Sequence, residues 1–402
     1  MRIMFAVPCY WPSQDGVTII TSYLAQGLAA KGHEVSVVTS AGNGGLQELP
    51  EHDLHEGVEI TRMRVQTRWP LFLRGRDNKS TKRAYRRQVK DFSPDVLIVV
   101  CAQTWTLDWI VSDLKNLDCV KVFYSHGYSA WKEQYFYKEQ LRKRNIVGVW
   151  ATYKCKRYFD KLHQRIRLFD RVIYLSEENN AAVYADQHGL KNGRILKNAI
   201  DDRFFEDDMR HQYEEKPCLR YLFVANYNKN KNQEMLIRAF SAAGIEKSQL
   251  LLVGFEENAY YEHLQEVIRE ELADQKQKEV LFYTHVDRET VIDLYRTSDV
   301  FVCPSRSENY PIVAHEAAAT GMPIISTNVG IYNRITGAYI VDGQEQMQKA
   351  MEELYDSAEE RKRRGSAAYD WVCGQGCRIQ DKVEWLEEEI RNIRGKRNEH
   401  ER

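Results

Sequence analysis

The chain has 402 residues with 43% apolar and 11% aromatic side chains, and its formal net charge at pH 7 is -1. This composition is globular, and the length exceeds what one typical hydrophobic core supports, so we expect two domains of about 200 residues each. The sequence contains no run of about 18 consecutive apolar residues, so it predicts no membrane-spanning helix.

The cysteines and the amino-terminal segment indicate the cellular compartment. Eight cysteines are scattered along the chain, with only Cys373 and Cys377 close together, and no spacing typical of a zinc site occurs. We therefore expect buried, reduced thiols. The segment from Met1 to Val7 has the pattern of a strand and is too short for a signal peptide, which favours a cytoplasmic location.

The first forty residues predict one βαβ unit, with a strand, a loop containing Gly16, a helix and a second strand. The expected segments are Ile3 to Val7, Ile19 to Lys31 and Glu34 to Thr39. Because Gly16 has no side chain, backbone amides around it could approach a phosphate closely. A simple turn is the alternative interpretation of this single glycine.

Three more apolar runs in the first half predict further buried strands, and His126 follows one of them. These runs are Val96 to Cys101, Val120 to Tyr124 and Val172 to Leu175. A histidine at the carboxyl end of a strand could hydrogen-bond a sugar or assist proton movement. A structural histidine that caps the strand is the alternative.

The net charge hides an uneven distribution along the chain. Residues 1–200 carry 30 Lys plus Arg against 20 Asp plus Glu, whereas residues 201–402 carry 27 against 38. Two basic stretches rich in aromatics, Arg68 to Lys90 and Lys132 to Arg171, suit an anionic membrane surface. A solvated basic face is the alternative, and nucleic acid is disfavoured because no nucleic-acid-binding motif accompanies the charge.

The second half repeats the pattern of buried strands after a linker that includes Asn198 to Asp201 and runs through Pro217. Its expected strands are Tyr221 to Ala225, Gln249 to Val253, Val280 to Tyr283, Val300 to Cys303 and Ile324 to Ser326. Together the two halves predict an α/β fold with two doubly wound parallel sheets.

A polar loop, Asn226 to Asn232, follows the first strand of the second half. Its Lys229 and Lys231 could supply ammonium groups to a diphosphate at the carboxyl end of the sheet. A hydrophilic turn with solvated lysines is the alternative.

The stretch from Ser307 to Ile325 places two carboxylates, Glu308 and Glu316, around a proline that can open a helix. Glu308 would lie in the loop, and Glu316 roughly 7–8 Å along a helix that starts near Pro311. A diphosphate could rest on the free amides of this helix start, with a sugar hydroxyl and a ribose diol reaching the two carboxylates. Unrelated surface glutamates are the alternative.

No Asp-x-Asp pair occurs in the chain, so the sequence lacks the carboxylate pair that usually coordinates a divalent metal bound to a nucleotide sugar. We expect no metal site and no cofactor, with lysine and helix amides neutralising the diphosphate. After Glu352 the chain is helical and charged, and Trp371 and Trp385 are expected to anchor the last helices.

These residues together resemble family 4 of the retaining glycosyltransferases, which have the GT-B fold of two facing Rossmann-like domains. The resemblance spans almost the whole chain. It is carried by Gly32 to Val35, His126-Gly127, Asn198 to Asp201, Lys231, and the Glu308 to Glu316 element followed by Gly321-Met-Pro. It implies an acceptor-binding domain at 1–200, a nucleotide-sugar-binding domain at 201–370, and helices at about 371–402 that cross back to the first domain.

The resemblance also implies the roles of the site residues. Glu316 matches a ribose ligand, Glu308 lies near the donor sugar, and Lys231 contacts the diphosphate. The expected catalytic residues are His126, Lys231 and Glu308, and the expected donor-binding residues are Gly16, Asn226, Lys231, Glu308, Asn309, Tyr310, Pro311, Ile312 and Glu316. The implied reaction is a same-face displacement in which the departing phosphate oxygen accepts the proton of the acceptor.

The chain departs from the family pattern at three places. Asn226 stands where the family often has an arginine, Asp15-Gly16 where two glycines are common, and Asn309 and Pro311 replace glycines after the first glutamate. Because Pro311 offers no amide, fewer backbone donors are expected to hold the ligand.

The sequence thus predicts a retaining, metal-independent glycosyltransferase of cell-surface polysaccharide biosynthesis, such as exopolysaccharide synthesis. It would move a sugar from a nucleotide sugar to a saccharide or lipid-linked acceptor at the inner face of the plasma membrane. UDP is the most common nucleotide carrier for such a sugar. A GT-B nucleotide-sugar epimerase and a non-catalytic nucleotide-sugar-binding protein are the alternatives. The sequence leaves the donor, the acceptor, the linkage and the oligomeric state open.

Overall fold

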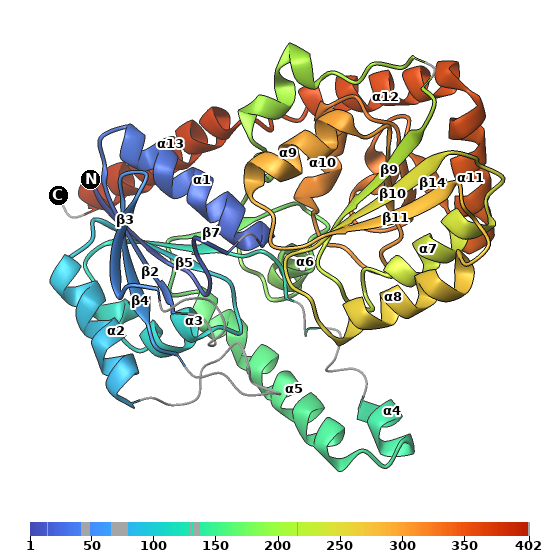
Figure 1. Ribbon diagram of the computed structural model, residues 1–402. Coiled ribbons are helices and arrows are strands. Elements are labelled where there is room, and N and C mark those ends of the chain that lie inside the picture. Colours follow the sequence, from blue (N-terminus) through green and yellow to red (C-terminus); the bar gives the residue numbers. More distant parts are fainter. Residues whose placement is uncertain are drawn as a thin grey trace. The chain divides into compact units, whose positions relative to one another are not determined.

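The computed structural model describes residues 1–13, 15–41, 49–65, 79–128, 131, 137–214 and 216–400. It divides into two compact units (Figure 1). Unit 1 comprises Met1–Asn198 and Ile379–Arg402, and unit 2 comprises Ala199–Arg378. The last segment of the chain therefore belongs to the same unit as the first.

Unit 1 is built on a sheet that has, among the described residues, eight strands in the order β3-β4-β2-β1-β5-β6-β7-β8. The strands are β1 (Arg2–Ala6), β2 (Glu34–Ser40), β3 (His52–His55), β4 (Val58–Met63), β5 (Val96–Val100), β6 (Val120–Tyr124), β7 (Arg171–Tyr174) and β8 (Gly193–Ile195). Every pair is parallel except the edge hairpin of β3 and β4. The central strands read as nearly continuous apolar runs because helices cover a parallel sheet on both faces.

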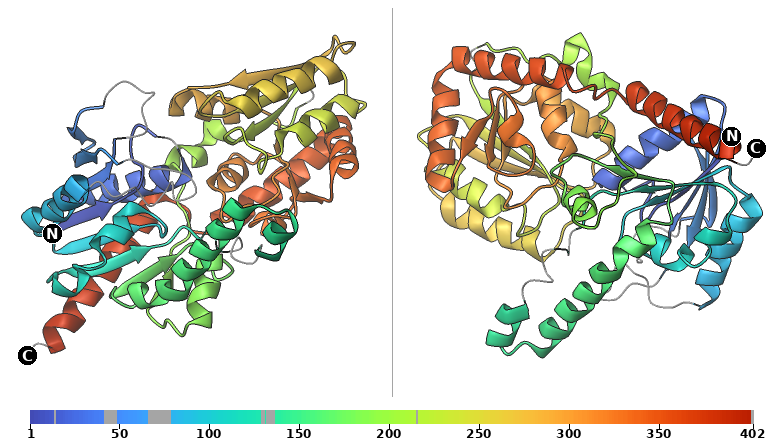
Figure 2. Two further views of the ribbon diagram at one scale, coloured as in Figure 1. Left: turned by 90° about the horizontal axis from the view of Figure 1, so that it is seen from below. Right: turned by 180° about the vertical axis from the view of Figure 1, so that it is seen from behind.

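The helices of unit 1 include two from opposite ends of the chain. They are α1 (Gly16–Ala30), α2 (Lys79–Phe92), α3 (Trp105–Ile110), η2 (Leu114–Asn116), α4 (Tyr137–Arg142), α5 (Ile146–Ile166), α6 (Asn180–Gln187) and α13 (Ile379–His400). Helix α13 lies against α1 (Figure 2). A Cβ at Gly27 would come within 2.4 Å of Val383 Cγ2, so this glycine permits the close approach. Glu387 adds ion pairs to Lys31 at 3.0 Å and His33 at 2.9 Å.

Unit 2 contains a wholly parallel sheet with the order β11-β10-β9-β12-β13-β14 in the described part of the chain. Its strands are β9 (Leu219–Val224), β10 (Ser248–Val253), β11 (Lys278–Tyr283), β12 (Val300–Cys303), β13 (Ile324–Thr327) and β14 (Tyr339–Val341). The strand order runs outward from β9 to β11 and then returns to β12 on the other side of β9. The carboxyl ends of β9 and β12 therefore form the topological switch point, where parallel α/β sheets bind ligands.

The helices of unit 2 connect these strands and complete its core. They are η4 (Asp202–Phe205), η5 (Asp207–Met209), α7 (Gln233–Ala242), α8 (Ala259–Glu271), α9 (Arg288–Thr297), α10 (Ile312–Ala319), η6 (Tyr332–Arg334), α11 (Gln344–Asp356) and α12 (Ala358–Cys373). Helix α10 packs against α12, where the rings of His315 and Trp371 lie 5.5 Å apart.

The prediction of two doubly wound parallel sheets and of a C-terminal helix that returns to the first unit is confirmed. The sequence missed the short edge strands β3, β8 and β14, which carry no long apolar run. It also missed β4, an inner strand whose apolar residues are interrupted by Glu59, Thr61 and Arg62. The eight cysteines are free, but the expectation that they are buried holds only for Cys119, Cys303 and Cys377. Cys9 and Cys373 are exposed, and the other three are partly buried. Within the described residues no helix is long and apolar enough to cross a membrane.

Candidate active site

The candidate site of unit 2 begins with two loops that follow β9 and β12 and are hydrogen-bonded to each other. Asn230 Nδ2 donates to the Ser307 carbonyl at 2.9 Å, and the Arg306 amide donates to the Asn230 carbonyl at 2.8 Å. The Asn232 amide group donates to the Pro304 carbonyl at 3.3 Å and accepts from the Arg306 guanidinium at 3.2 Å. These bonds fix the register of the two loops at the switch point.

This register brings Lys231 and Glu308 together. Lys231 Nζ lies 2.6 Å from Glu308 Oε1, and both side chains are mostly shielded from solvent. The Asn228 side chain accepts the Lys231 amide at 3.1 Å, which shapes the turn that presents the lysine. Lys229 of the same loop is exposed. Of the two lysines considered from the sequence, the structure thus places Lys231 beside the acidic element.

Gly330, in the turn after β13, determines how closely that turn approaches the Glu308 loop. Its φ is +55°, and a Cβ there would lie 3.0 Å from Glu308 Cβ and 3.2 Å from Pro311 Cδ. Glycine adopts this left-handed conformation without a steric penalty. The loop from Glu308 to Pro311 is therefore buttressed by a backbone that has no side chain.

Helix α10 starts immediately after this loop. Its first residue is Ile312, and Pro311 stands at the N-cap with extended backbone and no side-chain cap. The amides of the first turn of any helix lack intrahelical acceptors, so those of Ile312 and Val313 are available to an anion. Within the loop, Tyr310 is buried and Asn309 is exposed.

Glu316 is buried in the middle of α10, with only 1% of its side chain exposed. Its Oε1 forms an ion pair with Arg288, and its Oε2 has no hydrogen-bond partner among the described residues. Burial raises the pKa of the Tyr295 hydroxyl well above its usual value, and the nearby Glu316 carboxylate adds to that rise. A solvated surface position is excluded for Glu316, and the open lone pairs of Oε2 suit a hydroxyl donor.

Arg288 is a site residue that the sequence analysis missed. It is the first residue of α9, which follows the carboxyl end of β11, and Asp287 caps that helix by accepting the Thr290 amide at 2.8 Å. The Arg288 guanidinium also lies 5.2 Å from the ring centre of Phe204. The signal in the sequence was an arginine at a helix start after a strand, which is weak because many surface helices begin with charged residues.

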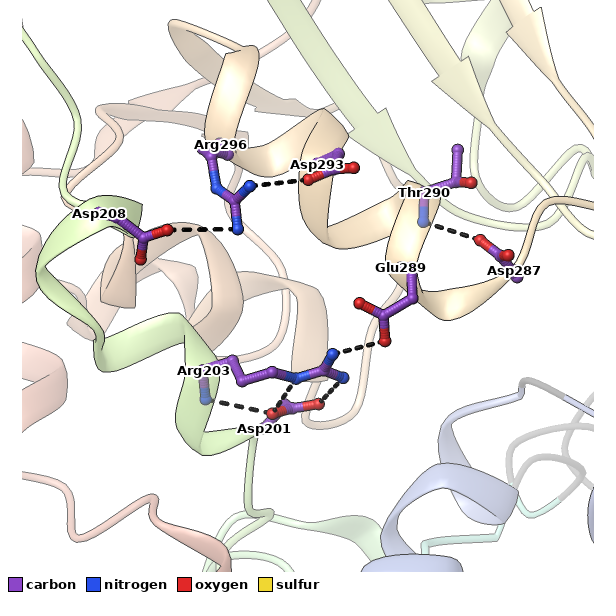
Figure 3. Close-up of polar contacts among 8 residues, drawn as sticks. All are labelled: Asp201, Arg203, Asp208, Asp287, Glu289, Thr290, Asp293 and Arg296. Atoms are coloured by element: carbon purple, nitrogen blue, oxygen red, sulfur yellow. Dashed lines mark hydrogen bonds and ion pairs between the residues drawn. The ribbon is translucent and has the colours of Figure 1, made fainter.

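A polar network braces the start of α9 against the segment that opens unit 2 (Figure 3). Arg203 donates to both carboxylate oxygens of Asp201, at 3.0 and 2.6 Å, and forms an ion pair with Glu289. Burial acts to raise the pKa of Asp201, but the hydrogen bonds from Arg203 outweigh it and the pKa lies below its usual value. About two turns further along α9, Arg296 contacts Asp293 at 3.0 Å and Asp208 at 3.5 Å. The network holds the residue next to Arg288 in place.

Asn226 has a different environment from the Lys231–Glu308 pair. Its side-chain oxygen accepts the Phe255 amide at 3.2 Å, and its carbonyl accepts from Gln233 Nε2 at 3.1 Å. The side chain therefore links the loop after β9 to the loop after β10.

The candidate residues of unit 1 lie at the carboxyl ends of its central strands. Gly16 is the first residue of α1, and the Asp15 carboxylate accepts the amides of Val17 at 3.0 Å and Thr18 at 3.1 Å. These capping hydrogen bonds use amides next to Gly16, which the sequence had led us to expect at a phosphate. The proposed role of Gly16 in closing over a phosphate stays a prediction.

His126 follows β6, and its ring lies 4.4 Å from that of Tyr124. Burial lowers the pKa of His126 to about 4, although the Asp15 carboxylate acts in the opposite direction. The imidazole is therefore neutral at pH 7, and its Nε2 has no hydrogen-bond partner within the part of the chain that the structure describes. A neutral imidazole can both donate and accept a hydrogen bond, as a role beside a sugar requires.

No group of three or more His, Cys, Asp or Glu side chains is arranged to hold a metal ion in the described ranges. The chemistry available at the unit 2 site is that of an anion- and hydroxyl-binding site. It combines a lysine, free helix amides and two carboxylates at the switch point of a parallel sheet.

The folds of solved proteins define the class to which this architecture belongs. Sucrose-phosphate synthase from Thermosynechococcus elongatus superposes with a TM-score of 0.74 at 18% identity, over 98% of this chain and 99% of that one. HepE of Anabaena, solved with UDP and glucose, superposes with a TM-score of 0.69 at 14% identity, over 97% and 99%. The two parallel α/β units are those of a GT-B glycosyltransferase.

The sequence comparisons then give the family. Residues 14–203 match the family described as Glycosyltransferase Family 4, and residues 205–371 match Glycosyl transferases group 1. The chain belongs to this glycosyltransferase family. An uncharacterised glycosyltransferase of Methanocaldococcus jannaschii is 24% identical over 78% of this chain and 77% of its own length. A 41.2 kDa protein from the cps region of Klebsiella pneumoniae is 26% identical over 29% of each chain.

Proposed function

We propose that the protein transfers a glycosyl unit from a UDP-sugar to a hydroxyl group of a saccharide or lipid-linked saccharide, with retention of the anomeric configuration and without a metal or other cofactor. The observation that carries the proposal is the buried Glu316, whose Oε2 has no hydrogen-bond partner among the described residues and which lies in the helix that starts beside the Lys231–Glu308 pair.

The donor fits this site by matching charge and hydrogen-bonding capacity. The diphosphate lies at the start of α10, where the amides of Ile312 and Val313 point outward and the positive end of the helix dipole favours an anion. Lys231, which pairs with Glu308 at 2.6 Å, adds an ammonium group beside this loop. The ribose diol donates to Glu316, which removes the cost of leaving a buried carboxylate oxygen without a partner.

The chain's own residues would assist the reaction chiefly by positioning and charge. Lys231 and the α10 amides stabilise the negative charge that develops on the departing diphosphate. The departing phosphate oxygen accepts the proton of the attacking hydroxyl on the same face of the sugar, so no general base is required from the protein. Glu308 accepts a hydrogen bond from a donor-sugar hydroxyl. For His126, a hydrogen bond between its neutral imidazole and a sugar stays a prediction.

Two relatives support the choice of donor and pathway. HepE of Anabaena has been solved with UDP and glucose, and the Klebsiella pneumoniae relative is encoded in a cps region. They support a UDP-sugar donor and a role in cell-surface polysaccharide synthesis.

The experiment that tests the proposal has two stages. First, thermal unfolding is followed with UDP, GDP, ADP and TDP, because a ligand that binds the folded state raises the unfolding temperature by mass action. We expect selective stabilisation by UDP with EDTA present, and equal responses to all four would contradict a specific donor site. Second, proton NMR follows the anomeric signal of UDP-sugars with and without a saccharide acceptor. Retention in an acceptor-dependent product supports the proposal, whereas isomerised donor without acceptor indicates an epimerase.

A further inference from the structure

The first half of α5 presents an apolar surface to solvent. Ile146 is 83% exposed, Val147 54%, Trp150 53% and Tyr153 52%. Residues 146, 150 and 153 recur at spacings of four and three, so they share one face of the helix. Leu141 at the end of α4 is also 50% exposed. We call these five residues the α5 tip.

The same helix behaves differently at its other end. Its second half buries Tyr158, Phe159, Leu162 and Ile166 in the core of unit 1. Helix α4 and the first half of α5 extend beyond the sheet and the other helices of that unit (Figure 1). The second half therefore anchors the helix, and the tip is a projection whose large apolar side chains make no contribution to this core.

Basic side chains predominate around the α5 tip, and the nearest acidic residue on α5 is Asp160, which pairs with Lys156 at 2.9 Å. Between Arg142 and Phe159 the sequence contains six basic residues and no acidic residue: Arg142, Lys143, Arg144, Lys154, Lys156 and Arg157. Two of these cations lie over aromatic rings of the tip, Lys154 Nζ at 3.1 Å from the Trp150 ring centre and the Arg157 guanidinium at 5.9 Å from that of Tyr153. Tryptophan and tyrosine beside cations are typical of the headgroup level of a bilayer.

We propose that the α5 tip docks unit 1 on an anionic phospholipid bilayer, with its apolar side chains in the headgroup–acyl boundary and its six cations against lipid phosphates. Charge complementarity selects this partner: two copies of so basic a surface repel each other, and nucleic acid offers no apolar phase for Ile146 and Val147. The docking itself does not depend on the proposed function. Its biological role does rest on that function, since a docked acceptor domain would work at the surface where lipid-linked saccharides lie.

Helix α2 is the natural comparison within unit 1. It carries Arg83, Arg87 and Lys90 as exposed cations, but none of the exposed large apolar side chains lies on it. Basic charge alone attracts a protein to anionic lipid weakly, whereas apolar insertion combined with charge gives stable docking. Substitutions on α2 and α5 can therefore distinguish a docking surface, which is basic and apolar, from a surface that is only basic.

The test measures co-sedimentation of the full chain with sucrose-loaded vesicles, without donor or acceptor. Vesicles contain phosphatidylcholine alone or with about 30% phosphatidylglycerol, which supplies the anionic surface. The variant Ile146→Ser/Trp150→Ser should lose roughly tenfold in affinity for anionic vesicles because two inserted side chains are removed. Arg142→Gln/Lys143→Gln/Arg144→Gln should bind both vesicle types equally weakly. The controls Leu54→Ser, which changes an exposed apolar residue on β3, and Arg83→Gln/Arg87→Gln/Lys90→Gln should stay close to the wild type.

Quenching of tryptophan fluorescence by brominated lipid gives a second measurement, which Trp150→Phe should abolish. The proposal is overturned if the wild type ignores anionic vesicles at low salt, if the α2 control loses as much as the α5 variants, or if Ile146→Ser/Trp150→Ser instead dissociates a dimer. UDP-dependent thermal stabilisation is measured on the same samples. A variant that loses vesicle binding but keeps the UDP response has a defect in docking alone. A wild-type protein that shows no UDP response overturns the proposed function, and its vesicle binding then tests the docking proposal independently.

Discussion

Arg288 and Glu316 form an ion pair that uses one carboxylate oxygen and leaves the other, Oε2, without a hydrogen-bond partner among the described residues. The arginine comes from the start of α9 and the glutamate from the middle of α10. An ion pair of this kind fixes the orientation of a buried carboxylate. The pair therefore prepares Oε2 to accept a hydrogen bond from a ligand.

Removing Arg288 should damage both folding and donor binding. Arg288→Met leaves Glu316 buried without its counter-ion, and breaking such a pair costs about 2–4 kcal/mol of unfolding free energy at a partly shielded site. The affinity for UDP should fall as well, because Oε1 and Oε2 are no longer oriented. Urea denaturation and calorimetric titration with UDP measure the two effects. Arg296→Met, on the same helix with partners that are mostly exposed, is the control and should change neither. An Arg288→Met protein with wild-type stability and affinity would contradict the assigned role.

Glu316→Gln tests whether the free oxygen receives the ribose. The amide keeps the shape of the side chain but loses the negative charge, so UDP affinity should fall roughly 10- to 100-fold, as expected for a hydrogen bond to a charged group. The decisive measurement compares UDP with an analogue that lacks both ribose hydroxyls. The wild type should discriminate strongly between them and Glu316→Gln only weakly, as in a double-mutant cycle. Glu308→Gln should keep the discrimination, and a Glu316→Gln protein that also keeps it would refute ribose binding by Glu316.

Lys231→Met should weaken binding of the diphosphate without affecting the nucleoside. Lys231 lies 2.6 Å from Glu308, and its charge favours a diphosphate at the adjacent helix start. We expect UDP affinity to fall about tenfold or more, uridine affinity to stay constant, and the salt dependence of UDP binding to become shallower. Lys229→Met removes an exposed lysine from the same loop and should have little effect. Equal losses in the two variants would mean that only the overall charge of the loop matters.

The sequence predicted where Glu308, Glu316 and Lys231 lie in the fold better than it predicted their contacts. Glu308, Glu316 and Lys231 could be found because loops after parallel strands meet at one edge of the sheet, and a proline before an apolar run indicates a helix start. The partner of Glu316 could not be found, because Arg288 lies 28 positions earlier in the chain and only the packing of α9 against α10 brings the two together.

Two further features depended on the tertiary structure. The hydrogen bond from Phe255 to Asn226 requires the loops after β9 and β10 to be neighbours, so sequence alone could not show that the Asn226 oxygen is occupied. The exposed tip of α5 is the second case. A run such as Ile146 to Trp150 predicts burial in a core, and only the surrounding structure shows that it is exposed.

Gly330→Ala should disturb the loop that carries Glu308. The added methyl group would meet Glu308 Cβ at 3.0 Å and Pro311 Cδ at 3.2 Å, and the positive φ adds strain of about 1 kcal/mol for any residue with a Cβ. Gly189→Ala is a matched control, since Gly189 has a similar φ of +63° but a Cβ there has no neighbour within 4 Å. Both variants should lose similar backbone stability in thermal unfolding. Only Gly330→Ala should also lose UDP affinity, and equal affinities in the two variants would show that this contact does not support the site.

His126 should make the stability of unit 1 depend on pH in a defined window. Its pKa is about 4 in the folded chain, below the ordinary value of 6.5, chiefly because it is buried. Between these two values the unfolded chain binds up to about one more proton than the folded chain, so stability is fully present above pH 6.5 and falls as the pH is lowered toward 4. His126→Asn should flatten this part of the pH profile in urea denaturation, whereas His52→Asn, which changes an exposed histidine of the same unit, should leave it unchanged. A profile of the His126→Asn protein that is as steep as that of the wild type would show that His126 is already protonated or solvated in the folded state.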